Sequence, residues 1–115
     1  MRPEITPAER LSQVVFIHDY IQLVFQDDVF SIYNTVQVSV GEAKFSQGTP
    51  GFTDALVGLI ESRATSVISG TEYSLQIFFE KGAVVTVLRG SAKANGPEAW
   101  QFGSLGGPVI VEIND

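Results

Sequence analysis

The chain has one histidine, His18, and a carboxylate, Asp19, follows it directly. A histidine oriented by a carboxylate is a common general base, so this dipeptide is where catalysis would first be sought. Adjacent residues on a strand point to opposite faces, however, and turn positions are usually solvated. The sequence also has no cysteine to activate and no serine in a nucleophile-elbow pattern. We therefore expect no catalytic residue and a protein that is not an enzyme.

Metal and phosphate sites have little support in the sequence. The only acidic doublet, Asp27-Asp28, lacks the alternating oxygen ligands and the central glycine of a calcium loop. The stretch GSLGGP (103–108) is followed neither by Lys-Ser/Thr nor by a helix, so it does not match a phosphate-binding loop. We expect no metal and no cofactor.

Charge and hydropathy exclude several classes of partner. The net charge is −6 and the seven basic residues are scattered, which argues against binding to nucleic acid or to an anionic membrane surface. No apolar run approaches a membrane-spanning length, and MRPEITPAERLSQ (1–13) has no apolar core typical of a secretory signal. A cytoplasmic location is the expectation.

Short apolar runs separated by turn residues predict strands in the first half of the chain. Residues 12–18 and 20–25 read as two strands around a turn at His18-Asp19, and a turn at Asp27-Asp28 leads to a third strand. This register places Phe25 opposite Phe30 and Leu23 opposite Ile32. It collects one apolar face, made of Ile21, Leu23, Phe25, Phe30 and Ile32.

The rest of the chain predicts a strand (35–40), a loop (41–51) and a helix (52–63), whose apolar face is Phe52, Leu56, Leu59 and Ile60. Strands follow at 64–69, 73–80 and 83–90, with a two-residue turn at Lys81-Gly82. That turn makes both faces of the hairpin apolar, with Leu75, Ile77 and Phe79 on one and Phe78, Val85 and Val87 on the other. Residues 95–102 predict a short helix that begins near Pro97, and residues 109–113 a last strand.

These elements predict one domain over residues 1–115, with a polar N-terminal arm at residues 1–10. The fold class is α+β, mostly antiparallel β: a curved sheet of about six to seven strands, partly rolled or split in two, packed on one main helix. The stretch YIQLVFQDDVFSIYN (20–34) has an echo in SLQIFFEKGAVVTVL (74–88), which aligns Phe25 with Phe79. An internal β-β-β duplication and two independent hairpins both explain this echo.

Surface candidates lie mainly on the first hairpin. Its second face carries Tyr20, Gln22, Gln26 and Tyr33, a set of aromatic and amide groups that suits a partner or a second copy of the chain. The single tryptophan, Trp100, is either an interface anchor or a residue that fills the edge of the core.

Three segments, LVGLIESRATSV, LQIFFEKGAVVTVLRG and NGPEAWQF, resemble a set of small uncharacterised bacterial proteins, some of which are immunity-like partners of secreted toxins. The resemblance covers roughly residues 55–102 and carries over no catalytic residue. It implies a domain that binds a protein.

Two hypotheses follow. The first is a non-enzymatic interaction or self-associating module, for which an immunity-type protein that caps a basic toxin is one version. The second is a small-ligand binder or unrecognised enzyme with a pocket between the two hairpin units, near the polar turn residues His18, Asp19 and Glu72.

Overall fold

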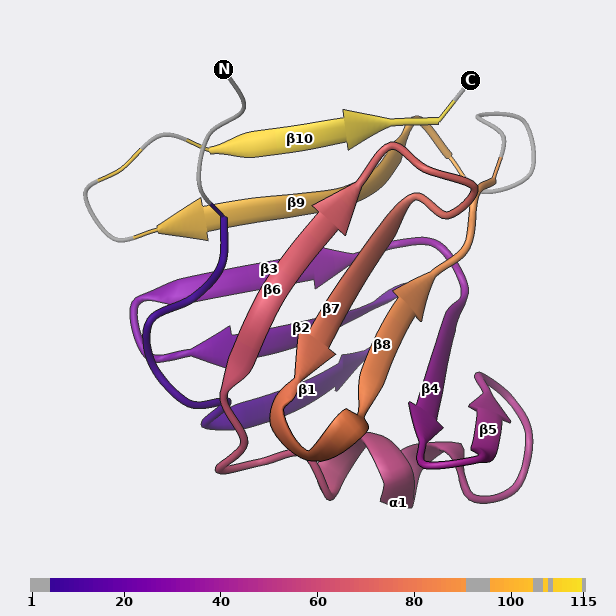
Figure 1. Ribbon diagram of the computed structural model, residues 1–115. Helices are drawn as coiled ribbons and strands as arrows, with labels where there is room; N and C mark the ends of the chain where they lie inside the picture. Colours follow the sequence, from indigo (N-terminus) through magenta and orange to yellow (C-terminus); the bar gives the residue numbers. More distant parts are fainter. Residues whose placement is uncertain (1–4, 91–95, 105–106, 108, 115) are drawn as a thin grey trace.

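The structure is a computed structural model, and it describes residues 5–90, 96–104, 107 and 109–114. Its elements in chain order are β1 (Gln13–Ile17), β2 (Tyr20–Phe25), β3 (Asp28–Ile32), β4 (Val36–Val40), β5 (Ala43–Ser46), α1 (Phe52–Val57), β6 (Ala64–Ser69), β7 (Leu75–Phe79), a 3-10 turn (Glu80–Gly82), β8 (Val84–Val87), β9 (Glu98–Ser104) and β10 (Ile110–Ile113). The strands form two five-stranded sheets that stack face to face with crossing strand directions (Figure 1). The single curved sheet is therefore wrong, and the alternative of a sheet split in two is the correct one.

The two sheets are built in the same way. Their strand orders are β1-β2-β3-β9-β10 and β5-β4-β8-β7-β6, and every pairing is antiparallel. Each sheet contains a three-stranded meander, β1-β2-β3 or β6-β7-β8. The hairpin that follows one meander in the chain completes the sheet of the other, so β4-β5 joins β8 and β9-β10 joins β3. Positions that occupy the same place in the two ladders are called equivalent below.

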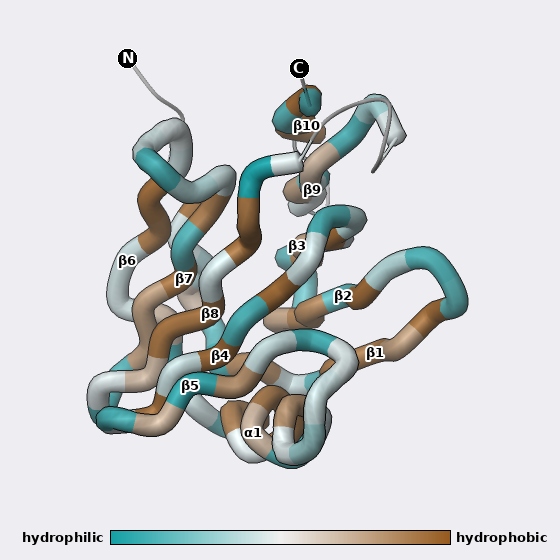
Figure 2. The backbone as a smooth tube through the Cα atoms, turned by 90° about the vertical axis from the view of Figure 1, so that its right-hand side faces the viewer, coloured by the Kyte–Doolittle hydropathy of each residue, from teal (hydrophilic) through white to brown (hydrophobic). Residues whose placement is uncertain are grey.

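The core lies between the inner faces of the sheets. On the first sheet Leu23 pairs with Phe30, which pairs in turn with Phe102. At the equivalent place on the second sheet, Ile77, Val85 and Val38 form the same row. All six side chains are buried, and hydrophobic segments of both sheets face one another across the interior (Figure 2).

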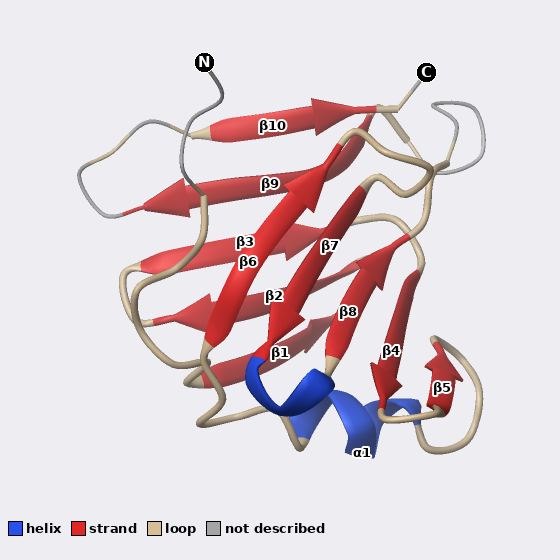
Figure 3. Cartoon of the chain, in the orientation of Figure 1, coloured by secondary structure: helices blue, strands red, loops and turns tan. Residues whose placement is uncertain are grey.

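Helix α1 closes one end of the sandwich but is shorter than predicted (Figure 3). It ends at Val57 because Gly58 follows and the next backbone hydrogen bonds are of the tighter i→i−3 kind, with Leu59 N donating to Leu56 O at 3.1 Å. Phe52, Leu56 and Leu59 are buried, as the helical spacing predicts. No helix in the described part of the chain is long and apolar enough to cross a membrane.

Two segments predicted as other structures are strands. Residues 98–104, expected to begin as a helix at Pro97, form β9 between β3 and β10, because Trp100 and Phe102 alternate with half-exposed Gln101 and both face the core. The predicted loop 41–51 contains β5, which pairs with β4 through the tight turn at Gly41 and Glu42.

The two hairpin turns differ from prediction with opposite consequences. The first turn lies at Gln26-Asp27, so Leu23 pairs with Phe30; this shift in pairing is an even number of residues and leaves the predicted apolar face intact. In the second hairpin the register differs from the predicted one by one residue, because the Glu80–Gly82 turn pairs Ile77 with Val85. Val85 and Val87 therefore share the core face with Leu75 and Ile77, and the prediction of two apolar faces is wrong.

The start of the chain is held against the sandwich at several described points. Ile5 is buried in the core cluster, and Arg10 forms an isolated bridge with Arg63 at the beginning of β6. Leu11, which precedes β1, is fully buried. Residues 1–4 of the predicted polar arm lie outside the described residues.

Candidate interaction surface

Apart from Glu98 at its margin, the outer face of the β1-β2-β3-β9-β10 sheet carries no charged side chain at the ladder positions that alternate with the core residues. This surface, called the uncharged face below, consists of Gln13, Val15, Ile17, Tyr20, Gln22, Val24, Val29, Ser31, Tyr33, Gln101, Gly103 and Val111. It is a mixture of apolar, aromatic and amide groups. Such a composition is typical of the centre of a protein interface, where charged residues are depleted and tyrosine is enriched.

Two tyrosines dominate one end of this face. The rings of Tyr20 and Tyr33 lie 5.3 Å apart between centroids, with their planes at 45°. Burial raises the pKa of the Tyr33 phenol above its ordinary value of 10.0; the Glu98 carboxylate and Tyr20 raise it further, whereas a hydrogen bond with the Ser31 side chain lowers it. The raised pKa keeps the Tyr33 phenol protonated at neutral pH, and the pair presents two rigid rings with polar tips.

A row of polar side chains crosses the middle of the uncharged face. Gln22 pairs with Ser31, which pairs with Gln101, and the Gln22 amide donates to the Ser31 hydroxyl at 3.2 Å. The other sheet repeats this row on its own outer face, where Gln76, Thr86 and Gln37 are paired and the Gln76 amide donates to Thr86 Oγ1 at 3.4 Å. In each of these equivalent rows a glutamine amide donates to a neighbouring hydroxyl, and neither row contains a charged side chain.

Acidic residues near this face lie in turns and at strand ends. Asp19 and Asp27 occupy the two turns of the β1-β2-β3 meander, whereas Glu42, Glu72 and Glu80 occupy turns of the other sheet. Glu98 stands beside Tyr33 at the start of β9. The uncharged face is thus a neutral surface with an acidic rim.

The structure divides the predicted surface residues among three places. Tyr20, Gln22 and Tyr33 come together on the uncharged face, and Gln26 lies in the adjoining turn with a φ of 60°. Trp100 is only 2% exposed, and its indole N–H donates to the backbone oxygen of Ser74 at 3.3 Å, which joins the two sheets. Trp100 therefore belongs to the core in this structure.

The predicted polar turn residues do not form one site. The side chains of His18 and Asp19 are 95% and 84% exposed, with 3.6 Å between His18 Nε2 and Asp19 Oδ1. Glu72 lies in the loop between β6 and β7. Figure 2 shows the β1-β2 and β6-β7 tips on opposite sides of the molecule. The described residues also contain no group of three or more His, Cys, Asp or Glu side chains placed to hold a metal ion.

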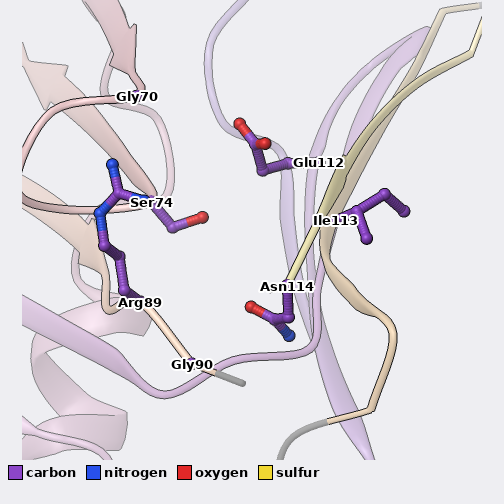
Figure 4. Close-up of a pocket in the computed structure, with 7 residues that line it drawn as sticks. All are labelled: Gly70, Ser74, Arg89, Gly90, Glu112, Ile113 and Asn114. Carbon is purple, nitrogen blue, oxygen red and sulfur yellow. The ribbon is translucent and has the colours of Figure 1, made fainter. Parts of the chain in front are cut away.

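A small hollow between the two sheets was not foreseen from the sequence. It has a volume of about 120 Å³ and is lined by Gly70, Ser74, Arg89, Gly90, Glu112, Ile113 and Asn114. Ser74 and Arg89 stand on one wall, with Glu112 and Asn114 on the other (Figure 4). Arg89 Nε donates to the Thr71 oxygen at 3.0 Å. These residues come from three separate stretches of sequence, so no local motif could have revealed the hollow.

Comparisons with protein-family models, with curated proteins and with solved structures find no match for this chain.

Proposed function

We propose that this protein is a non-enzymatic, cytoplasmic interaction domain that binds a protein partner through the uncharged face. The observation that carries the proposal is the neutral five-stranded surface with its tyrosine pair, in a chain whose net charge is −6. An isolated acidic domain is kept soluble by dispersed surface charge. A sheet face whose one charged ladder residue, Glu98, lies at its margin therefore favours a surface that is covered when the protein works.

The acidic rim favours a partner with basic groups around a neutral centre. Asp19, Asp27 and Glu98 stand at the ends of the strands that make the uncharged face. Charges at a rim steer association and suppress wrong partners more than they add affinity. An immunity-type protein that caps a basic toxin is one version of this proposal.

The experiment uses two equivalent positions. Val29 lies on the uncharged face and Val84 lies at the equivalent position of the other outer face, and both are half-buried. A photo-crosslinking residue at position 29 should trap one defined protein in the native host, and the same residue at position 84 should not. Val29→Lys should abolish capture, whereas Val84→Lys should retain it. Equal crosslinking from both positions, or none from either, would contradict the proposal.

A second candidate function is the binding of a small polar ligand in the hollow. The observation that favours it is the placement of Arg89 and Glu112 on opposite walls of the same space. With a volume of about 120 Å³, the hollow has room for several waters or for one small polar molecule. A cation and an anion facing each other across such a space suit a small zwitterion, such as a free amino acid.

Free amino acids are the probe for this second candidate. Ligand binding to the folded state should raise the melting temperature of the wild type in proportion to the logarithm of ligand concentration. Arg89→Gln should remove that shift, whereas Lys44→Gln on β5, away from the hollow, should keep it. The absence of any shift at high amino-acid concentration would reject the site.

We also infer that the two halves of the chain arose by duplication of a meander followed by a hairpin. Support comes from the identical strand order, from the equivalent core rows and from the repeated row of Gln and Ser or Thr on the outer faces. Because each half lends its hairpin to the other sheet, residues 1–50 and 51–115 expressed as separate chains should fold only when mixed. Independent folding of either half would contradict this history.

A further inference from the structure

The two sheets have four edge strands, and these differ in how they are protected. An edge strand exposes unpaired backbone groups that can pair with another chain, so natural edges are usually blunted by charges, proline, bulges or short length. The edges here are β1 and β10 on one sheet and β5 and β6 on the other.

Three of the four edges carry such a device. Strand β5 has only four residues and includes Lys44. Strand β6 has a register shift between Ala64 and Ser66, and its beginning is bridged by the chain at Arg10. Strand β10 has a register shift between Glu112 and Ile113 and includes a carboxylate.

Strand β1 has none of these devices. Its sequence QVVFI contains no charge, proline or glycine, and it pairs with β2 over all five residues without a register shift. Phe16 and Ile17 are 47% and 39% exposed. Among the described residues, no backbone hydrogen bond outside the sheet ladder involves residues 13–17. Helix α1 contacts β1 and buries Phe52 and Leu56 in the core.

We propose that β1 pairs antiparallel with β1 of a second copy, which joins two five-stranded sheets into one sheet of ten strands. An antiparallel pair of identical strands has a two-fold axis, and such an interface is closed, because the same patch serves both subunits. With Val15 on the axis, Val14 of one copy faces Phe16 of the other and Gln13 faces Ile17. Every pair in the seam is neutral, so no like charges meet in a chain of net charge −6.

Charge does not oppose the pairing at the ends of the seam in this register. The turn at His18-Asp19 of one copy lies toward the segment that precedes β1 in the other. That segment carries Glu9 and Arg10, both exposed, so it has no net charge. An identical strand pairs with β1 about a two-fold axis through five neutral pairs, and this self-complementarity favours a second copy over an unrelated peptide.

The dimer goes beyond the proposed function and enlarges its surface. The two-fold axis of an antiparallel strand pair is perpendicular to the sheet, so both uncharged faces lie on the same side. The tyrosine pairs of the two copies then belong to one continuous surface of ten strands. A partner with two-fold symmetry would contact both tyrosine pairs.

The chain has no cysteine, so a single introduced cysteine reports this pairing directly. Val15→Cys places two thiols opposite each other on the axis, with facing Cβ atoms about 4.5–5.5 Å apart, at the upper limit of the disulfide range. We expect a disulfide-linked dimer to form under mild oxidation at least tenfold faster than with Ile68→Cys. Ile68 is the matched control, because it is 42% exposed and occupies the equivalent position on the other edge, β6.

Light scattering on the purified chain completes the test. The wild type should have twice the chain mass of 12.5 kDa, and Val15→Lys, which sets two ammonium groups face to face, should halve that mass. Ile68→Lys should remain a dimer, and the β-sheet circular dichroism of both variants should match the wild type. A monomeric wild type, or equal crosslinking from positions 15 and 68, would overturn the dimer. The partner proposal is decided separately by crosslinking from positions 29 and 84.

Discussion

Phe25 and Phe79 occupy equivalent positions in the two meanders, and their rings stack across the sandwich. Their centroids are 6.1 Å apart and their planes differ by 21°. Both side chains are buried, Phe25 completely. The stack joins the ends of β2 and β7. The two halves of the chain therefore contact each other at equivalent positions, each occupied by a phenylalanine.

This contact predicts a coupling energy. Phe25→Leu and Phe79→Leu should each destabilise the fold, and the double variant should be less destabilised than the sum by roughly 0.5–1.5 kcal/mol, since either substitution already removes the stack. Urea unfolding followed by the fluorescence of Trp100, the single tryptophan, measures all three. Additive effects would show that the rings only fill space.

A second prediction concerns the buried amide pair of Asn34 and Asn114. Asn34 Nδ2 donates to Asn114 Oδ1 at 2.8 Å, and Asn114 Nδ2 donates back to Asn34 Oδ1 at 2.9 Å. Asn34 follows β3 and also donates to the Leu88 oxygen, so the pair holds both crossings between sheets. Asn34→Ala should cost about 1–3 kcal/mol, because it leaves a buried amide without its partner.

The control for the amide pair is Gln37→Ala on an outer face. The Gln37 amide donates to Ser46 Oγ at 3.3 Å in a partly exposed setting, and its loss should cost less than about 0.5 kcal/mol. If Asn34→Ala costs no more than Gln37→Ala in urea unfolding, the amide pair does not stabilise the crossings.

A third prediction follows from the raised pKa of Tyr33. The unfolded phenol ionises near 10.0 and the folded one at higher pH, so the folded state holds its proton longer. The stability that Tyr33 contributes is therefore complete below pH 10.0 and is lost as the pH rises through the folded pKa. Tyr33→Phe should show a smaller loss of stability over that window.

Glu98→Gln tests the causes of that shift. Removing the carboxylate should lower the pKa of Tyr33, but the pKa should stay above 10.0 because burial is the larger cause. Phenolate absorbance, with Tyr33→Phe as the reference that isolates this residue, gives the value. An unchanged pKa in Glu98→Gln would mean that Glu98 has no effect on Tyr33.

A fourth prediction concerns the turn that sets the second hairpin. Gly82 has a φ of +83° and a Cβ there would meet nothing within 4 Å, so Gly82→Ala should cost about 1–2 kcal/mol from the backbone alone. Gly103 on β9 also has open space around a Cβ, but its φ is ordinary. Gly103→Ala should therefore be neutral or stabilise by roughly 0.5–1 kcal/mol in the same unfolding experiment.

The alternation of apolar residues was enough to predict the core face of the first hairpin. Ile21, Leu23 and Phe25 face the interior wherever the turn lies, provided that the register moves by an even number of residues. In the second hairpin the register differs from the predicted one by a single residue. Lys81 and Gly82 are typical of a two-residue turn, but Phe79 N donates to the Ala83 oxygen at 2.8 Å and the turn has three residues. The longer turn places Val85 and Val87 on the face opposite to the predicted one.

The surface candidates show the same division. Tyr20, Gln22 and Tyr33 could be grouped from sequence because they are neighbours in one hairpin, whose local pairing follows from strand alternation. Gln101 and Val111 cannot be added to them from sequence, because Pro97 and Glu98 are typical of a helix start, whereas the structure has β9 between β3 and β10. The hollow around Arg89 and Glu112 likewise depends on contacts between distant segments.

The sequence by itself determined which residues are apolar, where most turns fall and that the fold is mostly antiparallel β, since strand periodicity and turn chemistry are local properties. Only the tertiary structure decided that there are two sheets, that each meander is completed by the hairpin of the other half, and that β1 is left as an open edge. Strand neighbours far apart in sequence are chosen by shared burial of side chains such as Trp100 and Phe102, and no local pattern records that choice.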